Sequence, residues 1–318
     1  MSIRVFDQLP DYQVLWSNPQ ILISSNIQIL KSSNPPQSCL MFLYVPWEAV
    51  LVMFAAVVLV PKGLRLLDWS PPFWYGGLAA GLCGGYLIFP HPAAPWLALP
   101  YLLLAAWLTV QEGLNLMVYK PFSLQELVRV FALGYWATGA AWAVCLLADF
   151  QPLGFDPLIV GLTAAHFHVA GFVLTTVIYV LLRLRTGWFT QILGGMALLG
   201  MPLVAVGITL TKWGYPPTVE GWSAGLFAGM AMAVAGVQLW EFNRRTLPWA
   251  ARWCWLGGAM CLLAGGVLAS LYALRFQWPL PWINIPNLKI WHGTLNAVGF
   301  GWLSLHGWQI ATTQISKT

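Results

Sequence analysis

Long hydrophobic stretches make up most of this chain, and polar residues are gathered in the short intervals between them. A helix needs about 20 apolar residues to cross the hydrocarbon core of a bilayer. Stretches of this kind are found at 39–61, 73–90, 94–113, 127–148, 158–182, 190–211, 221–241, 250–274 and 290–311. The pattern predicts an all-α fold, a polytopic membrane helical bundle with about nine transmembrane helices, within a range of roughly eight to ten.

Residues 1–36 break this pattern, because Asp7, Asp11 and the Pro35–Pro36 pair are mixed there with short apolar patches. The segment lacks the charged start, apolar run and small-residue cleavage site of a signal peptide. We therefore expect two parts. Residues 1–36 form an extramembrane tail or interfacial segment, and residues 37–318 form the transmembrane helical domain.

The composition supports a membrane protein. Of the 318 residues, 59% are hydrophobic and only 8% are charged, whereas about 25% of the residues in an ordinary soluble domain are charged. The five cysteines show no CxxC spacing, so they indicate neither a disulfide framework nor a zinc site.

Lysine and arginine are concentrated in alternate predicted loops, which sets an expected orientation because positive charges stay in short cytoplasmic loops. The loops concerned carry Lys62, Arg65, Lys120, Arg183, Arg185, Arg244 and Arg245. We expect a multi-pass protein of the inner (plasma) membrane with its amino terminus outside and its carboxy terminus in the cytoplasm. The net charge of +5 follows from this asymmetry and needs no nucleic-acid partner.

A few polar side chains fall within the predicted spans, where an ionisable group costs at least about 2 to 3 kcal/mol to insert and usually faces the bundle interior. Glu48, His166 and Asn296 are predicted to lie roughly 13, 12 and 9 Å below the outer ends of their spans, at about 1.5 Å per residue. His292 shares a helix face with Asn296, four residues further on. We expect these groups to meet in the outer half of the bundle.

Each of these residues also has an ordinary structural interpretation. His166 and His168 lie about 200° apart around one helix, so they cannot both line one pocket, and either can form an interhelical hydrogen bond. Glu48 is either a protonated carboxyl paired with a polar neighbour or a buried general acid. Asp156, just before a proline, is either a helix cap or a second acid at the outer mouth.

Aromatic residues make up 14% of the chain, and several of them lie within spans rather than at span ends. Buried aromatic faces attract cations by about 1 to 2 kcal/mol when desolvated, so a cavity lined with them suits a carbocation. They also simply fill gaps between helices. The residues concerned are Trp47, Trp107, Trp136, Trp142, Trp302 and Phe172.

Two blocks of the sequence carry a resemblance. LTAAHFHVAGF at 162–172 and WHGTLNAVGFGW at 291–302 each combine polar residues and glycines within an apolar run. With these blocks the chain resembles the YndJ-like family of bacterial integral membrane proteins, most of which have no assigned activity. Some bacterial membrane cyclases that close terpenoid or meroterpenoid chains are similar to it. The corresponding residues here are His166, Phe167, His168, Gly171, Phe172, His292, Gly293, Asn296, Gly299 and Phe300.

A second resemblance implies a different function. The string AHFH is similar to the haem–copper oxidase helix in which an HxH pair binds two haems on opposite faces. This chain lacks the adjacent histidine pair that holds copper in those enzymes. The alternative is therefore a haem- or metal-binding protein that uses His166 or His168 with His292 or His306.

The leading hypothesis is a membrane cyclase with no expected cofactor, whose partners are the lipid bilayer and a hydrophobic isoprenoid substrate. Glu48, or else Asp156, protonates an alkene or epoxide, while His166 or His292 orients the acid and accepts the final proton. Asn296 positions the polar end of the substrate. The expected substrate-binding residues are Trp47, Phe167, Phe172, Trp302 and His168. A transporter and a structural membrane subunit are further alternatives.

Overall fold

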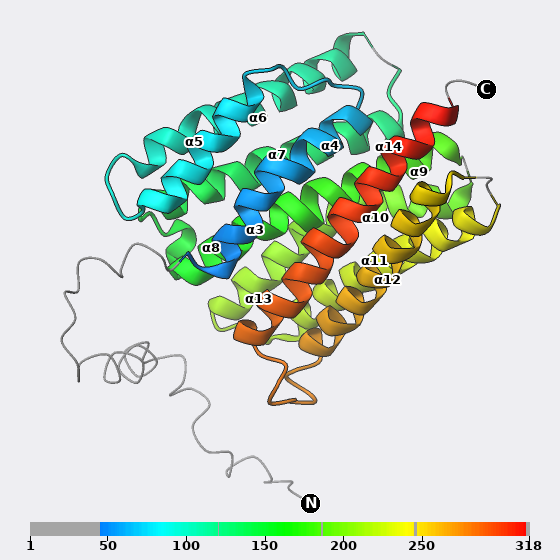
Figure 1. The fold of residues 1–318 in the computed structure, drawn as a ribbon. Coiled ribbons are helices and arrows are strands. Elements are labelled where there is room, and N and C mark those ends of the chain that lie inside the picture. The colour runs from blue at the N-terminus through cyan, green and yellow to red at the C-terminus, as the bar shows by residue number, and fades with distance from the viewer. Residues whose placement is uncertain (1–44, 120, 186, 245–246, 316–318) are drawn as a thin grey trace, which may run out of the picture. The chain divides into compact units, whose positions relative to one another are not determined.

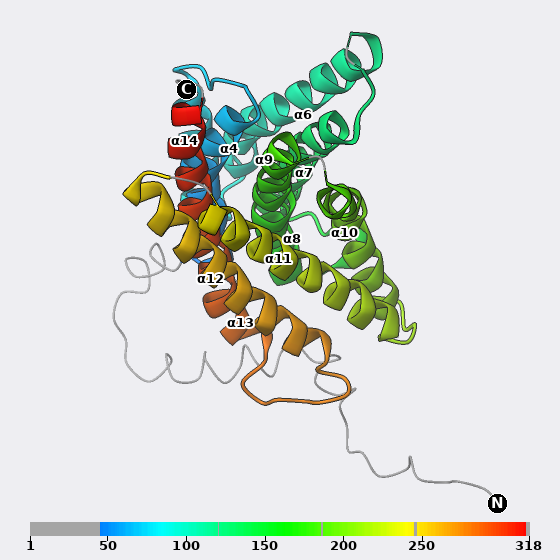
Figure 2. The same cartoon turned by 90° about the vertical axis from the view of Figure 1, so that its right-hand side faces the viewer.

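The fold is given by a computed structural model that describes residues 45–119, 121–185, 187–244 and 247–315. Every element in these ranges is a helix, and the ranges contain no strand. The helices run side by side in both views (Figures 1 and 2). The expectation for residues 1–36 lies outside the described residues.

Nine continuous helices pass through the described ranges, because several elements join end to end. Seven of the nine are long and apolar enough to cross a membrane, and α5 is a shorter apolar helix. The predicted all-α membrane bundle is thus confirmed. The helices are α3–η2–α4 (Trp47–Phe54, Ala55–Leu59, Val60–Leu66), α5 (Tyr75–Ile88), α6 (Ala94–Val118), α7 (Leu124–Leu147), α8–η4–α9 (Pro157–His166, Phe167–Val173, Leu174–Leu184), α10 (Trp188–Lys212), α11 (Thr218–Arg244), α12 (Trp249–Ala273) and α13–η5–α14 (Ile285–Thr294, Leu295–Trp302, Leu303–Ile315), and a short 3-10 turn, η3 (Pro152–Gly154), precedes α8.

Two helix ends differ from the predicted spans. The first helix continues past residue 61 to Leu66, and Pro61 stands just after the π segment η2 without ending the helix. The last helix begins before residue 290. The side chain of Asn284 accepts a hydrogen bond from the backbone N–H of Asn287 at 2.9 Å, and Pro286 stands in the first turn, so the helix has an ordinary capped start.

The helix α8–η4–α9 is the central one. In its most apolar window 83% of the residues are buried, the largest share among the seven long apolar helices. It packs against α7, α10 and the first helix. Among residues 158–182, all of which the structure describes, His166 is the one exposed residue. A polar side chain therefore remains accessible in the middle of the most buried helix.

Three segments of π-helix meet inside the bundle. They are η2, η4 and η5, and each of them contacts the other two. The approach of η5 to η2 is close, since a Cβ at Gly301 would lie 3.1 Å from a methyl carbon of Leu59. Short π segments are rare and are often found at functional sites. Here they fall on the three helices that carry Glu48, His166 and Asn296.

Candidate functional site

The rings of His166 and His292 stack on each other, with centroids 6.1 Å apart and planes inclined by 28°. His166 is the last residue of α8, and His292 lies near the end of α13. Nδ1 of His166 is 2.8 Å from the carbonyl oxygen of Leu162, and Nδ1 of His292 is 2.9 Å from that of Gly265. Because a carbonyl oxygen only accepts, both Nδ1 atoms carry the hydrogen, and Nε2 of each neutral ring is an acceptor.

Asn296, on η5, contacts the His292 member of this pair. Its Nδ2 donates to the backbone carbonyl of His292 at 2.9 Å and lies 3.3 Å from Nε2 of the same ring. A Cβ at Gly265 would lie 2.7 Å from the Asn296 amide, so only glycine allows α12 to come this close. Sequence reasoning did not identify Gly265, although the Gly265–Gly266 pair within a span is a signal for close helix packing.

Glu48 is buried, with 6% of its surface exposed, and it forms an ion pair with Lys289. Oε2 of Glu48 lies 3.3 Å from Nζ of Lys289, which stands on α13, one residue before the predicted span 290–311. The Glu48 side chain also packs on Gly161 of α8, where a Cβ would lie 3.0 Å from its Cγ. Glu48 thus has an ammonium partner, which differs from the protonated carboxyl expected as one alternative.

The ion pair and the histidine pair lie at neighbouring levels of the same three helices. Gly161, which Glu48 contacts, precedes His166 by five residues, and Lys289 precedes His292 by three. At about 1.5 Å per residue, the two pairs are roughly 5 to 8 Å apart along the helices. The structure therefore brings together three of the expected catalytic residues, His166, His292 and Asn296, and places Glu48 with Lys289 about one turn away along the same helices.

Comparison with known proteins supports the resemblance seen in the sequence. The profile of the YndJ-like proteins matches residues 50–300. The chain belongs to the YndJ-like family. A relative, the uncharacterized membrane protein YndJ of Bacillus subtilis (strain 168), is 30% identical over 207 residues, which are 62% of this chain and 35% of that protein. The match thus spans about a third of the curated relative's length. No solved structure matches the chain.

Asp156 of this YndJ-like protein is a helix cap. Its carboxylate accepts a hydrogen bond from the backbone N–H of Ile159 at 3.1 Å, and the residue is exposed. The same hydrogen bond fixes the start of the central helix. This bond agrees with the helix-cap alternative for Asp156, and it is the hydrogen bond that the described residues show for its carboxylate.

His168 belongs to a buried hydrogen-bond chain of the YndJ-like bundle. Trp136 Nε1 donates to the Tyr101 hydroxyl at 2.8 Å, and that hydroxyl lies 3.3 Å from Nε2 of His168. Nδ1 of His168 donates to the carbonyl of Ala164 at 2.8 Å. Both ring nitrogens are engaged, and the side chain is fully buried. His168 therefore has a protein hydrogen-bond partner for each ring nitrogen, as the interhelical-bond interpretation expects.

The expected aromatic residues are dispersed. Phe172 is fully buried against the Trp136 ring, and Phe167 packs with Tyr135 in a separate cluster. Trp302 is 41% exposed, so it does not line the interior. Among the expected substrate-binding aromatic residues, Trp47 is the one next to the ion pair, because it directly precedes Glu48 in the chain.

Six buried side-chain polar atoms have no hydrogen-bond partner among the described residues, and two of the six lie on helices that pack against each other at the first span. These two are Nε1 of Trp47 on α3 and the hydroxyl of Tyr86 on α5, the helix that packs against α3. A buried donor without an acceptor costs about 1 to 3 kcal/mol. A bound polar group would remove that cost. Elsewhere in the described ranges, no group of three or more histidine, cysteine, aspartate or glutamate side chains could hold a metal ion.

Proposed function

We propose that this YndJ-like protein is an integral membrane enzyme that cyclises a linear prenyl chain, or the epoxide of one, as a terpenoid or meroterpenoid cyclase. The observation that carries the proposal is the exposed His166 in the middle of the most buried helix, stacked on His292. Polar groups that remain accessible inside an apolar bundle are typically functional. A site surrounded by lipid also excludes water, which would otherwise quench a carbocation.

Glu48 and Lys289 supply the proton in this proposal. When the apolar substrate displaces water, a buried ion pair becomes costly, and transfer of the ammonium proton to Glu48 leaves two neutral groups. Glu48 then protonates the epoxide oxygen or the terminal alkene. The π electrons of the chain form the new carbon–carbon bonds, and the final cation loses a proton to Nε2 of His166. The product is an isomer of the substrate, and the enzyme is restored when the proton on His166 returns to Lys289 on product release, so atoms and charge balance.

The polar end of the substrate is held by the remaining groups. The hydroxyl of Tyr86 and Nε1 of Trp47 are buried donors near Glu48 that lack an acceptor, and an epoxide or head-group oxygen would satisfy them. Asn296 keeps the His292 ring in place through its bond to the His292 carbonyl. The Trp47 ring face stabilises positive charge close to the point of protonation.

Membrane location follows from the relative and from the seven apolar helices, and we propose the inner (plasma) membrane with the amino terminus outside and the carboxy terminus in the cytoplasm. Basic residues near the ends of α4, α9 and α11 support this orientation, namely Lys62, Arg65, Arg183, Arg185 and Arg244. A carboxy-terminal fluorescent protein should fluoresce, and an alkaline phosphatase fused there should be inactive. The opposite pattern would reverse the topology.

The activity is tested with the full chain in lipid nanodiscs. Farnesylated and geranylgeranylated aromatic substrates and their epoxides are added, and products of unchanged mass but altered retention are sought by mass spectrometry. His166→Ala should abolish turnover. His306→Ala is the matched control, because His306 contacts Lys62 at a level well away from the stacked pair. If the folded protein converts none of these substrates, the cyclase proposal fails.

A further inference from the structure

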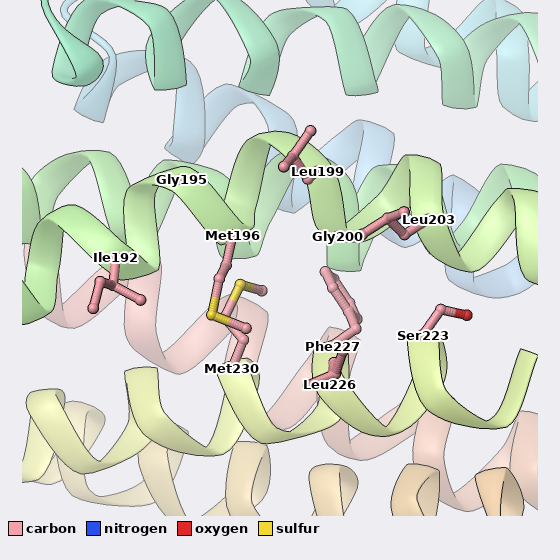
Figure 3. A pocket seen from close by; sticks show the side chains of 10 residues that line it. All are labelled: Ile192, Gly195, Met196, Leu199, Gly200, Leu203, Ser223, Leu226, Phe227 and Met230. Atoms are coloured by element: carbon pink, nitrogen blue, oxygen red, sulfur yellow. The ribbon is translucent and has the colours of Figure 1, made fainter. Parts of the chain in front are cut away.

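A cavity of about 330 Å³ lies between α10 and α11, beside Gly195. Figure 3 shows the side chains of Met196 and Met230 directed toward each other across it. Ser223 is the one polar side chain in its lining, and its hydroxyl donates to the backbone carbonyl of Glu220 at 3.1 Å. Since no charged group lines this cavity, the acyl chains of ordinary bilayer lipid suffice to cover it, and its lining selects no particular ligand.

A smaller cavity, of about 200 Å³, has a different lining. It is formed by Phe242 near the end of α11 and by Trp249, Arg252 and Trp253 at the start of α12. The guanidinium of Arg252 lies over the Phe242 ring, 4.8 Å from its centre. One cationic side chain thus stands among three aromatic side chains, and we call this cavity the Arg252 pocket.

The charge of Arg252 is not balanced by an acid among the described residues. No described carboxylate forms an ion pair with it, and the acid nearest in the sequence, Glu241, is bound to Arg185 at 3.1 Å. Arg183 and Arg275, by contrast, each pair with a described carboxylate. An arginine keeps its charge at any physiological pH. The Arg252 pocket therefore presents a positive charge whose counter-ion comes from outside the described part of the chain.

The pocket lies where a bilayer changes from hydrocarbon to headgroups. α12 is long and apolar enough to cross a membrane, and Trp249 is its first residue. Trp249 is 77% exposed and Trp253 is 57% exposed, and the two rings meet edge to face with centroids 6.2 Å apart. Exposed tryptophans at the end of a membrane-crossing helix lie at the level of the headgroups. Arg252 follows Trp249 by three residues, or about 4.5 Å, so its long side chain reaches the lipid phosphates.

Charge complementarity favours a lipid with a net negative charge. A second arginine, Arg244, ends α11 beside the pocket, and its guanidinium lies over the Trp240 ring at 4.5 Å. A zwitterionic headgroup would bring an ammonium group, which needs a carboxylate or an open aromatic face. The lining has no carboxylate, and Arg252 already covers the Phe242 face. The pocket thus suits a phosphate better than it suits a phosphate joined to a cation.

We propose that the Arg252 pocket binds the headgroup of an anionic phospholipid of the phosphatidylglycerol type. The guanidinium donates two hydrogen bonds to the phosphate oxygens, in the bidentate geometry that arginine prefers with phosphate. The headgroup glycerol lies against the tryptophan rings, and the acyl chains continue along the apolar surface of α12. Arg252 precedes Gly265, which contacts Asn296, by 13 residues of α12, or about 20 Å, so this inference does not rest on the proposed function.

Native mass spectrometry of the full chain tests the site. The purified protein in detergent is titrated with palmitoyl-oleoyl phosphatidylglycerol, and separately with the phosphatidylcholine that carries the same acyl chains. The first phosphatidylglycerol should bind about tenfold more tightly than phosphatidylcholine, because a charge-assisted hydrogen bond without a competing ammonium contributes about that factor. Equal affinity for the two lipids would overturn the proposed preference for an anionic headgroup.

Two substitutions of the same arginine separate geometry from charge. Arg252→Gln should lower the affinity for phosphatidylglycerol about tenfold and leave phosphatidylcholine nearly unchanged. Arg252→Lys keeps the charge but loses the bidentate geometry, so its affinity should fall between those of the native protein and Arg252→Gln. Because Arg252 is exposed, both variants should fold, and their unfolding temperatures check this. Native affinity in Arg252→Gln would overturn the site.

Arg244→Gln is the matched control, because it removes the same charge at the same end of the bundle but from a residue outside the lining. Salt screens its effect on the pocket, so the affinity for phosphatidylglycerol should stay within about twofold. If Arg244→Gln weakens binding as much as Arg252→Gln does, the preference belongs to the whole basic end and the pocket is wrong. Displacement of the lipid by inorganic phosphate would indicate a site for the free ion, and it would also overturn the lipid site.

Discussion

Gly139 on α7 makes room for His168 on η4. A Cβ at position 139 would lie 2.6 Å from Nδ1 of His168 and 3.2 Å from the carbonyl oxygen of Ala164, and these are the two atoms of one hydrogen bond. The central helix can therefore pack on α7 with its buried histidine intact only because position 139 has no side chain. This histidine is a structural element, whereas His166, two residues earlier, belongs to the candidate site.

Gly139→Ala should destabilise the bundle. Overpacking of this kind typically costs about 1 to 3 kcal/mol. Gly134→Ala is the control on the same helix, since a Cβ there would meet only a Thr109 methyl at an ordinary 3.6 Å. It should be neutral or stabilising by up to about 1 kcal/mol, because alanine is the better helix former. Thermal unfolding in detergent measures both, and equal stability of the two variants would contradict the packing argument.

Tyr101→Phe should reduce stability without removing activity. It leaves Nε1 of Trp136 without its acceptor and Nε2 of His168 without its donor, and each buried unsatisfied group costs about 1 to 3 kcal/mol. The turnover per folded molecule should remain, in contrast to His166→Ala. If Tyr101→Phe abolished turnover in a fully folded protein, the hydrogen-bond chain of Tyr101, Trp136 and His168 would belong to the reaction.

Lys289→Met should lower the stability of the folded protein, although methionine fits an apolar bundle. The substitution leaves the Glu48 carboxylate buried without a partner. Removal of one member of a buried ion pair costs about 3 to 5 kcal/mol. The 20% exposure of the Lys289 side chain favours the lower end of that range. The double variant Glu48→Gln, Lys289→Met should recover most of the stability but no turnover. The free energy of unfolding of the two variants provides the comparison, and a double variant no more stable than Lys289→Met would argue against the pair.

Gly265→Ala should impair both stability and the turnover of the molecules that remain folded. Its Cβ would displace the Asn296 amide and disturb the His292 ring, whose Nδ1 is bound to the carbonyl of the same residue. Gly236→Ala on α11 is the control, because a Cβ there meets nothing within 4 Å. Gly265→Ala should unfold at a lower temperature than Gly236→Ala because its Cβ overpacks the Asn296 amide, and product formation per folded molecule should fall only in Gly265→Ala. Normal turnover in Gly265→Ala would separate Asn296 from the reaction.

The helices of this fold could be predicted because a long apolar run is a local property that needs no knowledge of neighbours. The same holds for the divergence of His166 and His168, which follows from helix geometry alone. Lys289 was missed because a lone charge after several prolines is typical of a loop, and its contact with Glu48 depends on how two distant helices pack. The cavity beside Gly195 depends on how α10 and α11 meet, which one chain segment cannot reveal.

The π segments were also beyond sequence reasoning, since no residue preference marks them. Each one accommodates a residue more than a regular α-helix would, and one residue rotates a helix by about 100°. The positions of buried residues in α8 and in α9 therefore follow two helical repeats that are offset by about 100°. A single repeat carried through the whole central helix would assign the wrong α9 residues to each neighbouring helix. Deleting a single residue such as Ala170 should therefore turn η4 into a regular α-helix, while Leu174–Leu184 keeps the same buried side chains toward its neighbours.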